Sequence, residues 1–292
     1  MHSKYLATPR DIIIPNSHPL SSCEMLGKLF FSRMLRCVRN TYLRKTLSPS
    51  ICSARKLSST KMVHILLDQH NPEETALEAP YLKLYTFGTP NGRKVSTLLE
   101  LLHLDYHVHS LDITKNESKQ DWFLKINPNG RIPTLTEADS NGNQFSISES
   151  GAILLYLADK YDKDRKFSYA YGTKEYYEEL EWLMFQMAGV GPMTGQANHF
   201  VRFTKEDIPY AKKRYLDEVR RLCSVLEERL ERNPHKALFL VGDHLSLADI
   251  ATYPWIYGLK FLDIDVNDYP KLAQWAEQIS KIEEVKKGMS VP

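Results

Sequence analysis

Residues 146–159, SISESGAILLYLAD, are the stretch around which the rest of the chain is organised. The pattern predicts the end of a strand, a polar turn and the start of an apolar helix. Ser148 or Glu149 can cap this helix, and the free N–H groups of its first turn favour a carboxylate. Glu149 adds an acceptor for an ammonium group. The stretch therefore either holds the α-amino-acid end of a small molecule or is an ordinary capped helix without a ligand.

Strand and helix patterns alternate ahead of this stretch. The pattern predicts strands over 81–87, 106–111, 131–135 and 144–147, and helices over 93–103 and 118–126. The first strand, helix and second strand fit within about 30 residues, which indicates a parallel pair with a right-handed crossover. With a final helix ending near Tyr161, the order β-α-β-α-β-β-α predicts an α/β, thioredoxin-like domain over residues 81–162.

The rest of the chain is predicted to be all-helical. After a linker, apolar residues recur at helical spacing from Lys174 onward, which defines a second domain over residues 174–290. Glycine and proline in residues 189–192 predict a bend in its first helix. Residues 246–249, Ser-Leu-Ala-Asp, form a capping box that starts a buried helix. Tyr269-Pro270 precedes the last predicted helix.

The N-terminal region has a different composition. Residues 1–67 form a basic extension, and residues 68–80 are a polar, acidic linker. From Met25 to Leu67 there is no Asp or Glu, while Lys and Arg alternate with apolar residues. This composition is typical of a mitochondrial transit peptide, with cleavage near Ser58. A disordered basic arm and a membrane-surface helix are the alternatives. Translation starting at Met62 would instead give a cytoplasmic protein without the signal.

Composition excludes several classes of function. The 292 residues are 42% hydrophobic and 25% charged, and the net charge of +2 gives no reason to expect a nucleic-acid partner. No apolar run approaches the roughly 18 residues of a membrane span, so a membrane protein is not expected. Three of the four cysteines lie in the extension, and only Cys223 lies in the folded body. Their spacing predicts neither a metal site nor a catalytic dithiol.

Three motifs together resemble the glutathione S-transferase superfamily over about 210 residues, from Tyr81 to the C-terminus. They are NPNGRIPTL at 127–135, SESGAI at 148–153 and SLADI at 246–250. TPNG at 89–92 and GPMTGQANHF at 191–200 resemble, more narrowly, the nu-class bacterial enzymes and the fungal transferases related to a yeast nitrogen-catabolism regulator. The resemblance implies glutathione as co-substrate, no metal, and a homodimer.

The resemblance also implies where glutathione binds. Ile132-Pro133 would carry a cis peptide bond, and the Ile132 backbone would pair with the cysteinyl backbone of glutathione. Glu149 and Ser150 would hold the γ-glutamyl ammonium and carboxylate. Arg131 would contact the glycyl carboxylate, although a solvated turn residue would look the same. A polar residue within 118–120 is a further candidate.

The catalytic candidates follow the first strand. A glutathione thiol needs a hydrogen-bond donor that favours its thiolate. Tyr85 lies too early, within the strand, so Thr89 and Asn91 at the start of the next helix are the predicted catalytic residues, as the nu-class pattern implies. An Asn-Gly turn with a capping Thr89 is the alternative.

The second substrate is left open by the sequence. The thiolate would attack either an electrophilic carbon, giving a conjugate, or a disulfide or peroxide. The wall of this second site is expected from four residues, Met193, His199, Phe200 and Phe203. A non-catalytic, glutathione-binding regulator on the same fold is the competing function.

Overall fold

The computed structural model describes residues 64–66 and 77–292. The description below concerns the unit formed by residues 58–292. The predicted transit peptide, its cleavage site and most of the predicted linker fall outside the described residues.

A five-stranded mixed sheet forms the first domain. In space the order of the strands is β1 (His64–Leu66), β3 (His107–Ser110), β2 (Tyr81–Thr86), β4 (Thr134–Ala138) and β5 (Gln144–Ser148). β2 and β3 are parallel and are joined through α1 (Pro90–Leu101), whereas β4 runs antiparallel to both β2 and β5. The predicted thioredoxin-like α/β order is therefore confirmed. β1, which pairs in parallel with β3, lies inside the predicted extension and was not expected as a strand.

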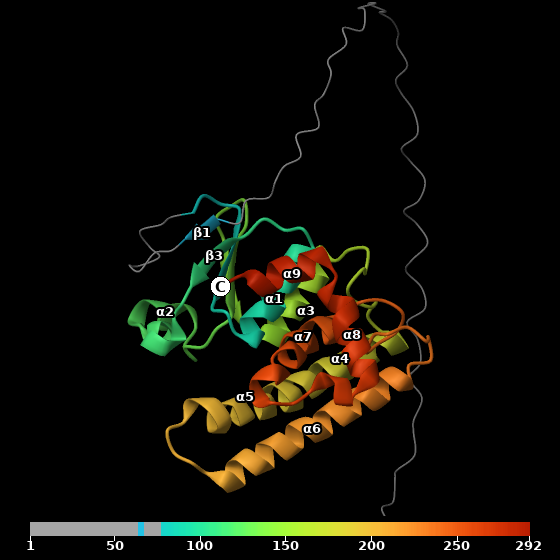
Figure 1. Ribbon diagram of the computed structural model, residues 1–292. Helices are drawn as coiled ribbons and strands as arrows, with labels where there is room; N and C mark the ends of the chain where they lie inside the picture. The colour runs from blue at the N-terminus through green and yellow to red at the C-terminus, as the bar shows by residue number, and fades with distance from the viewer. Residues whose placement is uncertain (1–63, 67–76) are drawn as a thin grey trace, which may run out of the picture. The chain divides into compact units, whose positions relative to one another are not determined.

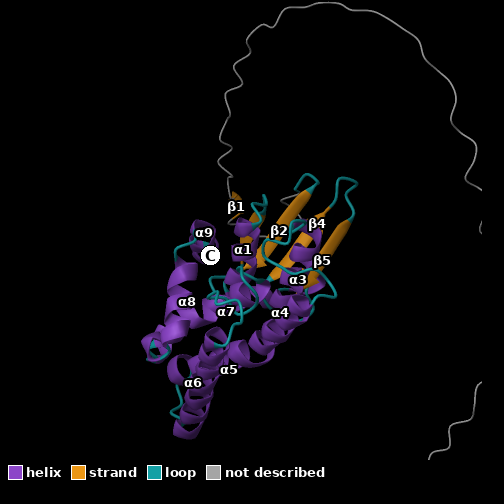
Figure 2. Cartoon of the chain, turned by 90° about the vertical axis from the view of Figure 1, so that its right-hand side faces the viewer, coloured by secondary structure: helices purple, strands orange, loops and turns teal. Residues whose placement is uncertain are grey.

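Helices cover both faces of this sheet (Figures 1 and 2). α1 and α3 (Ser150–Tyr161) lie on one face, where Leu84 joins the main core. The next residue of β2, Tyr85, points to the other face and packs 5.6 Å from Phe123 of α2 (Asp121–Ile126), measured between ring centroids. Burial raises the pKa of the Tyr85 phenol. Tyr85 is thus a core residue, as its position within the strand predicts.

The second domain is helical, as predicted. Its main helices are α4 (Lys174–Phe185), α5 (Gly191–Asn198), α6 (Pro209–Glu231), α7 (Leu247–Tyr257), α8 (Pro270–Ser280) and α9 (Glu283–Ser290). Instead of stopping at the predicted bend, α4 passes through a π-helical turn over Gln186–Val190 into α5, and a second such turn follows over His199–Phe203. In Figure 1, α5 and α6 lie side by side.

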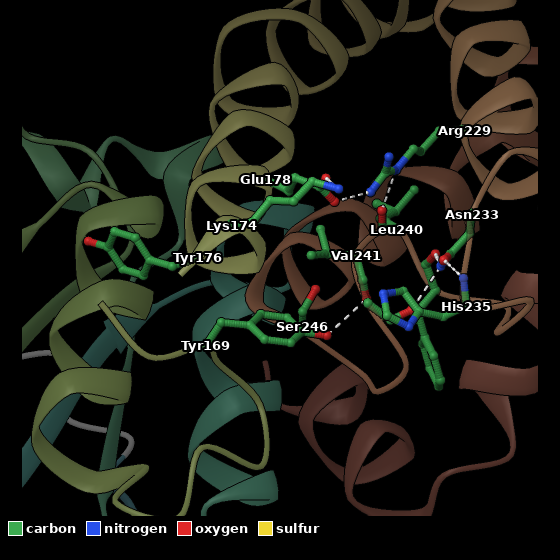
Figure 3. Close-up of polar contacts among 12 residues, drawn as sticks. Tyr169, Lys174, Tyr176, Glu178, Arg229, Asn233, His235, Leu240, Val241 and Ser246 are labelled. Atoms are coloured by element: carbon green, nitrogen blue, oxygen red, sulfur yellow. Dashed lines mark hydrogen bonds and ion pairs between the residues drawn. The ribbon is translucent and has the colours of Figure 1, made fainter. Parts of the chain in front are cut away.

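A polar network fixes the loop between α6 and α7 (Figure 3). Arg229 donates from Nε to the Leu240 carbonyl at 2.6 Å, and its guanidinium also pairs with Glu178 of α4 at 2.8 Å. Asn233 donates to two further carbonyls of the loop, and the Tyr169 hydroxyl donates to the Val241 carbonyl at 3.0 Å. The loop that leads into α7 is thereby tied to α4 and α6.

The predicted capping box at the start of α7 is present. Asp249 accepts from the Ser246 backbone N–H at 3.0 Å and from the Ser246 hydroxyl at 2.7 Å. The same carboxylate accepts from Trp275 Nε1 of α8 at 2.8 Å. Burial raises the pKa of Asp249, and these donors oppose that shift. The motif therefore joins α7 to α8 as well as starting α7.

Helix α9, which was not predicted as a separate helix, packs along α1 (Figure 1). The Ser96 hydroxyl of α1 donates to the Gly288 carbonyl at 2.7 Å. A Cβ at Gly288 would lie only 2.3 Å from the Thr97 Cα. The short, charged segment of α9 has few apolar residues, so helical spacing gave little signal there. Gly288 permits the close approach that holds it.

Gly288→Ala should therefore destabilise the protein. Because the added methyl would meet backbone rather than a flexible side chain, we expect a loss of about 1–3 kcal/mol of unfolding free energy. Thermal unfolding followed by circular dichroism measures it. Ser290→Ala, on the exposed side of the same helix, is the control. Equal melting temperatures for the two variants would contradict this packing.

Candidate active site

A cleft of about 1000 Å³ lies between the two domains of residues 77–292. All seven predicted site residues line it: Thr89, Asn91, Arg131, Ile132, Pro133, Glu149 and Ser150. The helical domain contributes the opposite wall, which includes Met187, Thr194, Gly195, Asn198, Arg202, Phe203, Trp255 and Phe261. The fold thus brings the predicted residues into one site, while the role of each stays a prediction.

The two catalytic candidates lie at the N-terminus of α1. Thr89 is the N-cap, and its hydroxyl oxygen accepts from the Gly92 N–H at 3.3 Å. The hydroxyl proton remains available to a ligand, because a hydroxyl both accepts and donates. Asn91 lies in the first turn, where the helix dipole favours an anion. Gly92 is required here, since a Cβ would lie 2.2 Å from the Thr86 hydroxyl. Capping and ligand binding by Thr89 are therefore compatible.

The segment before β4 has a fixed shape. The Ile132-Pro133 peptide bond is cis, as predicted. Asn127 donates to the Arg131 carbonyl at 2.8 Å and to the Thr134 hydroxyl at 3.1 Å. Gly130 has φ +57°, and a Cβ there would lie 2.7 Å from the Ser118 carbonyl oxygen. These contacts hold the edge next to Ile132, which faces the cleft. Ser118 and Lys119, from the segment left open by the sequence, also line it.

The start of α3 differs from the expected cap. Glu149 occupies the N-cap position without a side-chain capping bond, and the Ser148 hydroxyl pairs with Thr134 at 3.0 Å instead. Glu149 is therefore the N-cap, one of the two residues predicted for that position, but its side chain makes no capping bond. Glu149 has φ +71° and ψ 114°, a strained backbone for a residue with a side chain. Its carboxylate is exposed and lines the cleft, and Ser150 is buried beside it.

Lys94 is the site component that sequence reasoning missed. This α1 residue is 1% exposed, and its Nζ lies 3.2 Å from Ser150 Oγ, 2.6 Å from Gln186 Oε1 and 3.3 Å from Met187 Sδ. Burial lowers the Lys94 pKa to about 7, and the nearby Glu149 charge opposes that shift. In the sequence Lys94 follows Arg93 and resembles an exposed charged residue. Its helical spacing, which places it on the buried side of α1, was the sequence feature that could have identified it.

The expected wall of the second substrate site needs correction. Phe203 lines the cleft, but Met193, His199 and Phe200 are not among its described lining residues. Phe200 instead stacks on Tyr215 of α6 at 5.5 Å. Helical spacing explains the difference, because the residues that do line the cleft, 194, 195, 198 and 202, occupy another face of the same helical stretch. The motif located the correct segment, but we inferred the wrong face.

Positive charge dominates the cleft. Among its described lining residues are four cations, Arg93, Lys119, Arg131 and Arg202, and one carboxylate, Glu149. Arg202 lies against the rings of Phe203 and Phe261, with its Cζ 5.1 and 4.7 Å from the two centroids. This arrangement favours ligands with more carboxylates than ammonium groups.

Two family models match the chain. The model described as glutathione S-transferase, N-terminal domain, matches residues 80–159, and the model for the C-terminal domain of the same family matches residues 186–283. The chain belongs to the glutathione S-transferase family. The predicted resemblance is confirmed. The two matched regions are the sheet domain and the helical domain, whose facing surfaces form the cleft.

Similar proteins include an oxidoreductase, a glutathione transferase homologue and Ure2p, of which one solved structure is described as the nitrogen regulation fragment of a yeast prion protein. The disulfide-bond oxidoreductase YfcG of Escherichia coli is 40% identical over 200 residues, which cover 68% of this chain and 89% of the relative. A glutathione transferase homologue from Lodderomyces elongisporus, solved with two glutathione molecules per subunit, is 49% identical with a TM-score of 0.71, covering 73% of this chain and 99% of that one. Ure2p in complex with glutathione is 32% identical with a TM-score of 0.68, covering 73% and 100%.

The described residues show neither a group placed to hold a metal ion nor a helix suited to crossing a membrane. In residues 64–66 and 77–292, no group of three or more His, Cys, Asp or Glu side chains is placed to hold a metal ion. Within the same part of the chain, no helix combines the length and the apolar character that crossing a membrane requires.

Proposed function

We propose that this glutathione S-transferase binds glutathione in the cleft and activates it as a thiolate. The observation that carries the proposal is that four features line one cleft. Donors at the N-terminus of α1, Thr89 and Asn91, suit a sulfur anion. The Ile132 backbone edge suits an extended peptide, and the pair of Glu149 and Ser150 suits an α-amino-acid end. Arg131 suits the remaining carboxylate.

The favoured reaction is glutathione-dependent disulfide reduction. Glutathione disulfide carries four carboxylates and two ammonium groups, so it matches the excess of cations in the cleft better than a neutral electrophile does. The bound thiolate would attack a disulfide sulfur and expel the other sulfur as a thiolate. The thiolate of a second glutathione would then attack the glutathione sulfur of the mixed disulfide, which expels the second substrate thiolate and forms glutathione disulfide. No cysteine lies near Thr89 in the sequence, so glutathione supplies every thiol. A peroxide is a second acceptor for the same thiolate.

Steady-state assays on residues 58–292 test this preference. We expect glutathione-dependent reduction of a small disulfide to exceed conjugation of an aryl halide in kcat/KM, with peroxide reduction as a side activity. Faster conjugation than disulfide reduction would reverse the assignment. Binding of glutathione without turnover of disulfide, peroxide or aryl halide would instead support a non-catalytic regulator. The similarity to Ure2p is the observation that favours this second function.

We also propose that the protein is a homodimer. Large hydrophobic side chains remain exposed on β5 and α4 in the single chain, namely Phe145, Tyr177 and Met184. A second copy is a partner that can cover such a surface. Light scattering of the purified protein distinguishes the two states, and a monomeric mass would reject the proposal.

Mitochondrial location is proposed from composition alone. The acid-free, basic segment from Met25 to Leu67 supports import, with a mature N-terminus near Ser58. N-terminal sequencing of the protein from its native cell tests this. An intact Met1, or a start at Met62, would overturn the mitochondrial proposal, and a start at Met62 would favour the cytoplasm.

A further inference from the structure

The buried Lys94 ammonium lies directly behind the residue proposed to hold the γ-glutamyl carboxylate. Its Nζ lies within hydrogen-bond distance of three atoms: Ser150 Oγ at the start of α3, and Gln186 Oε1 and Met187 Sδ in the π-helical turn after α4. A lysine ammonium only donates hydrogen bonds, so each of these atoms must act as its acceptor. Lys94 therefore joins the two domains at the floor of the cleft.

We propose that Lys94 is a positioning residue for the γ-glutamyl carboxylate of glutathione. The Lys94 ammonium donates to the Ser150 oxygen from the buried side, so the Ser150 hydroxyl proton points to the ligand. The ligand carboxylate in turn compensates the positive charge of Lys94. This inference rests on the proposed binding of glutathione at Ser150.

The hydrogen bonds at Ser150 support the first part. When Lys94 donates to Ser150 Oγ, the serine hydroxyl proton must point elsewhere. In the structure it is directed to Met187 Sδ at 3.6 Å, which is a weak acceptor. A carboxylate oxygen is a much stronger acceptor than a thioether, so an arriving carboxylate takes this proton. Lys94 thus gives Ser150 a fixed direction of donation.

The charges around Lys94 support the second part. The Glu149 carboxylate is the charge that opposes the lowering of the Lys94 pKa. The π-helical turn presents only the neutral Gln186 and Met187, and α7 presents the Trp255 ring, with its centroid 6.0 Å from Nζ. α9, which also packs on α1, meets it at Gly288 beside Thr97. A buried cation with so little compensation favours an incoming anion.

Proton linkage gives this arrangement a measurable consequence. The Lys94 pKa is lowered to about 7 by burial, and a bound carboxylate would raise it. Binding should then be accompanied by proton uptake near neutral pH, and affinity should weaken as pH rises above 7. S-hexylglutathione is the suitable probe, because it keeps both carboxylates and lacks a thiol that would titrate.

The test is titration calorimetry of S-hexylglutathione binding to the wild type, Lys94→Met, Ser150→Ala and the double variant. At pH 6.5 we expect each single change to raise Kd about tenfold, as for loss of a charge-assisted hydrogen bond. The double variant should resemble the singles, because the two residues act as one unit. The weakening of affinity between pH 6.5 and 8 should be steeper in the wild type than in Lys94→Met.

Three outcomes decide the matter. If Lys94→Met unfolds more easily but keeps the wild-type Kd and pH dependence of binding, Lys94 has only a structural role. The positioning role is then rejected, while the proposed binding of glutathione is kept. If the wild type binds but turns over no substrate, the catalytic proposal falls and the inference stands on binding. If the wild type does not bind, both fall. Lys281→Met, an exposed lysine of the helical domain, is the control and should bind normally.

A measurement on the wild type covers the case in which Lys94→Met does not fold. Calorimetry at pH 7.0 in two buffers of different ionisation enthalpy reports the protons taken up on binding. At this pH the ligand's own amino group is already largely protonated, so uptake of a fraction of a proton supports the proposal. The absence of uptake would overturn it.

Discussion

Replacing Asn91 by alanine should lower the turnover of a small disulfide about 100-fold, while leaving the dissociation constant for glutathione nearly unchanged. The magnitude is that of removing one donor from a site where negative charge is stabilised. Asn91 is proposed to meet the sulfur, whereas most of the proposed binding contacts of glutathione are those of Ile132, Glu149 and Ser150. Steady-state kinetics gives the turnover, and titration calorimetry gives the affinity.

The control is Asn267→Ala, which removes an exposed amide far along the chain. If Asn91→Ala lost affinity and turnover to the same extent, Asn91 would serve to position glutathione rather than to activate it. Thr89→Val adds a second comparison. It removes the hydroxyl but keeps the shape, so it shows whether the thiolate depends on the N-cap as well.

Replacing Glu149 by glutamine should raise the dissociation constant for glutathione roughly 10- to 100-fold, the range for a lost hydrogen bond to a charged group. The carboxylate is exposed in the cleft and makes no capping bond, so the fold does not depend on its charge. Thermal unfolding should therefore change little. Isothermal titration measures the affinity.

Glu206→Gln, on an exposed loop, is the matched control for loss of one carboxylate. An unchanged affinity in Glu149→Gln would place the ligand ammonium elsewhere. Because Glu149 opposes the lowering of the Lys94 pKa, its loss should also move the pH dependence of binding to lower pH. The proposed ammonium contact and the proposed carboxylate contact are thus linked.

Much of the fold was predictable because its signals are local. The strand pattern of residues 81–87, the capping box at Ser246 and the helical spacing of apolar residues from Lys174 onward each depend on neighbouring residues. The cis bond at Pro133 followed from the family resemblance. The strand β1 and the helix α9 were missed because they are short, and what holds α9 is a distant contact, that of Gly288 with Thr97.

Part of the site was also predictable because its sequence signals are local. Thr89, Asn91, Arg131, Glu149 and their neighbours stand in compact motifs, and the structure places them around one cleft. Lys94 was not predicted because its burial beside the site involves Gln186, which is distant in sequence and contacts Lys94 only across the domain interface. The second wall was assigned to the wrong face, since spacing defines the faces of a helix but not which of them meets the cleft.

The most direct test of the central claim is a crystal structure of the protein with glutathione disulfide. We expect one γ-glutamyl carboxylate on Ser150, its ammonium at Glu149 and the adjoining sulfur within hydrogen-bond distance of Thr89 or Asn91. The second half should extend toward Arg202. A disulfide bound outside this cleft, or bound in it with its sulfur away from α1, would contradict the account.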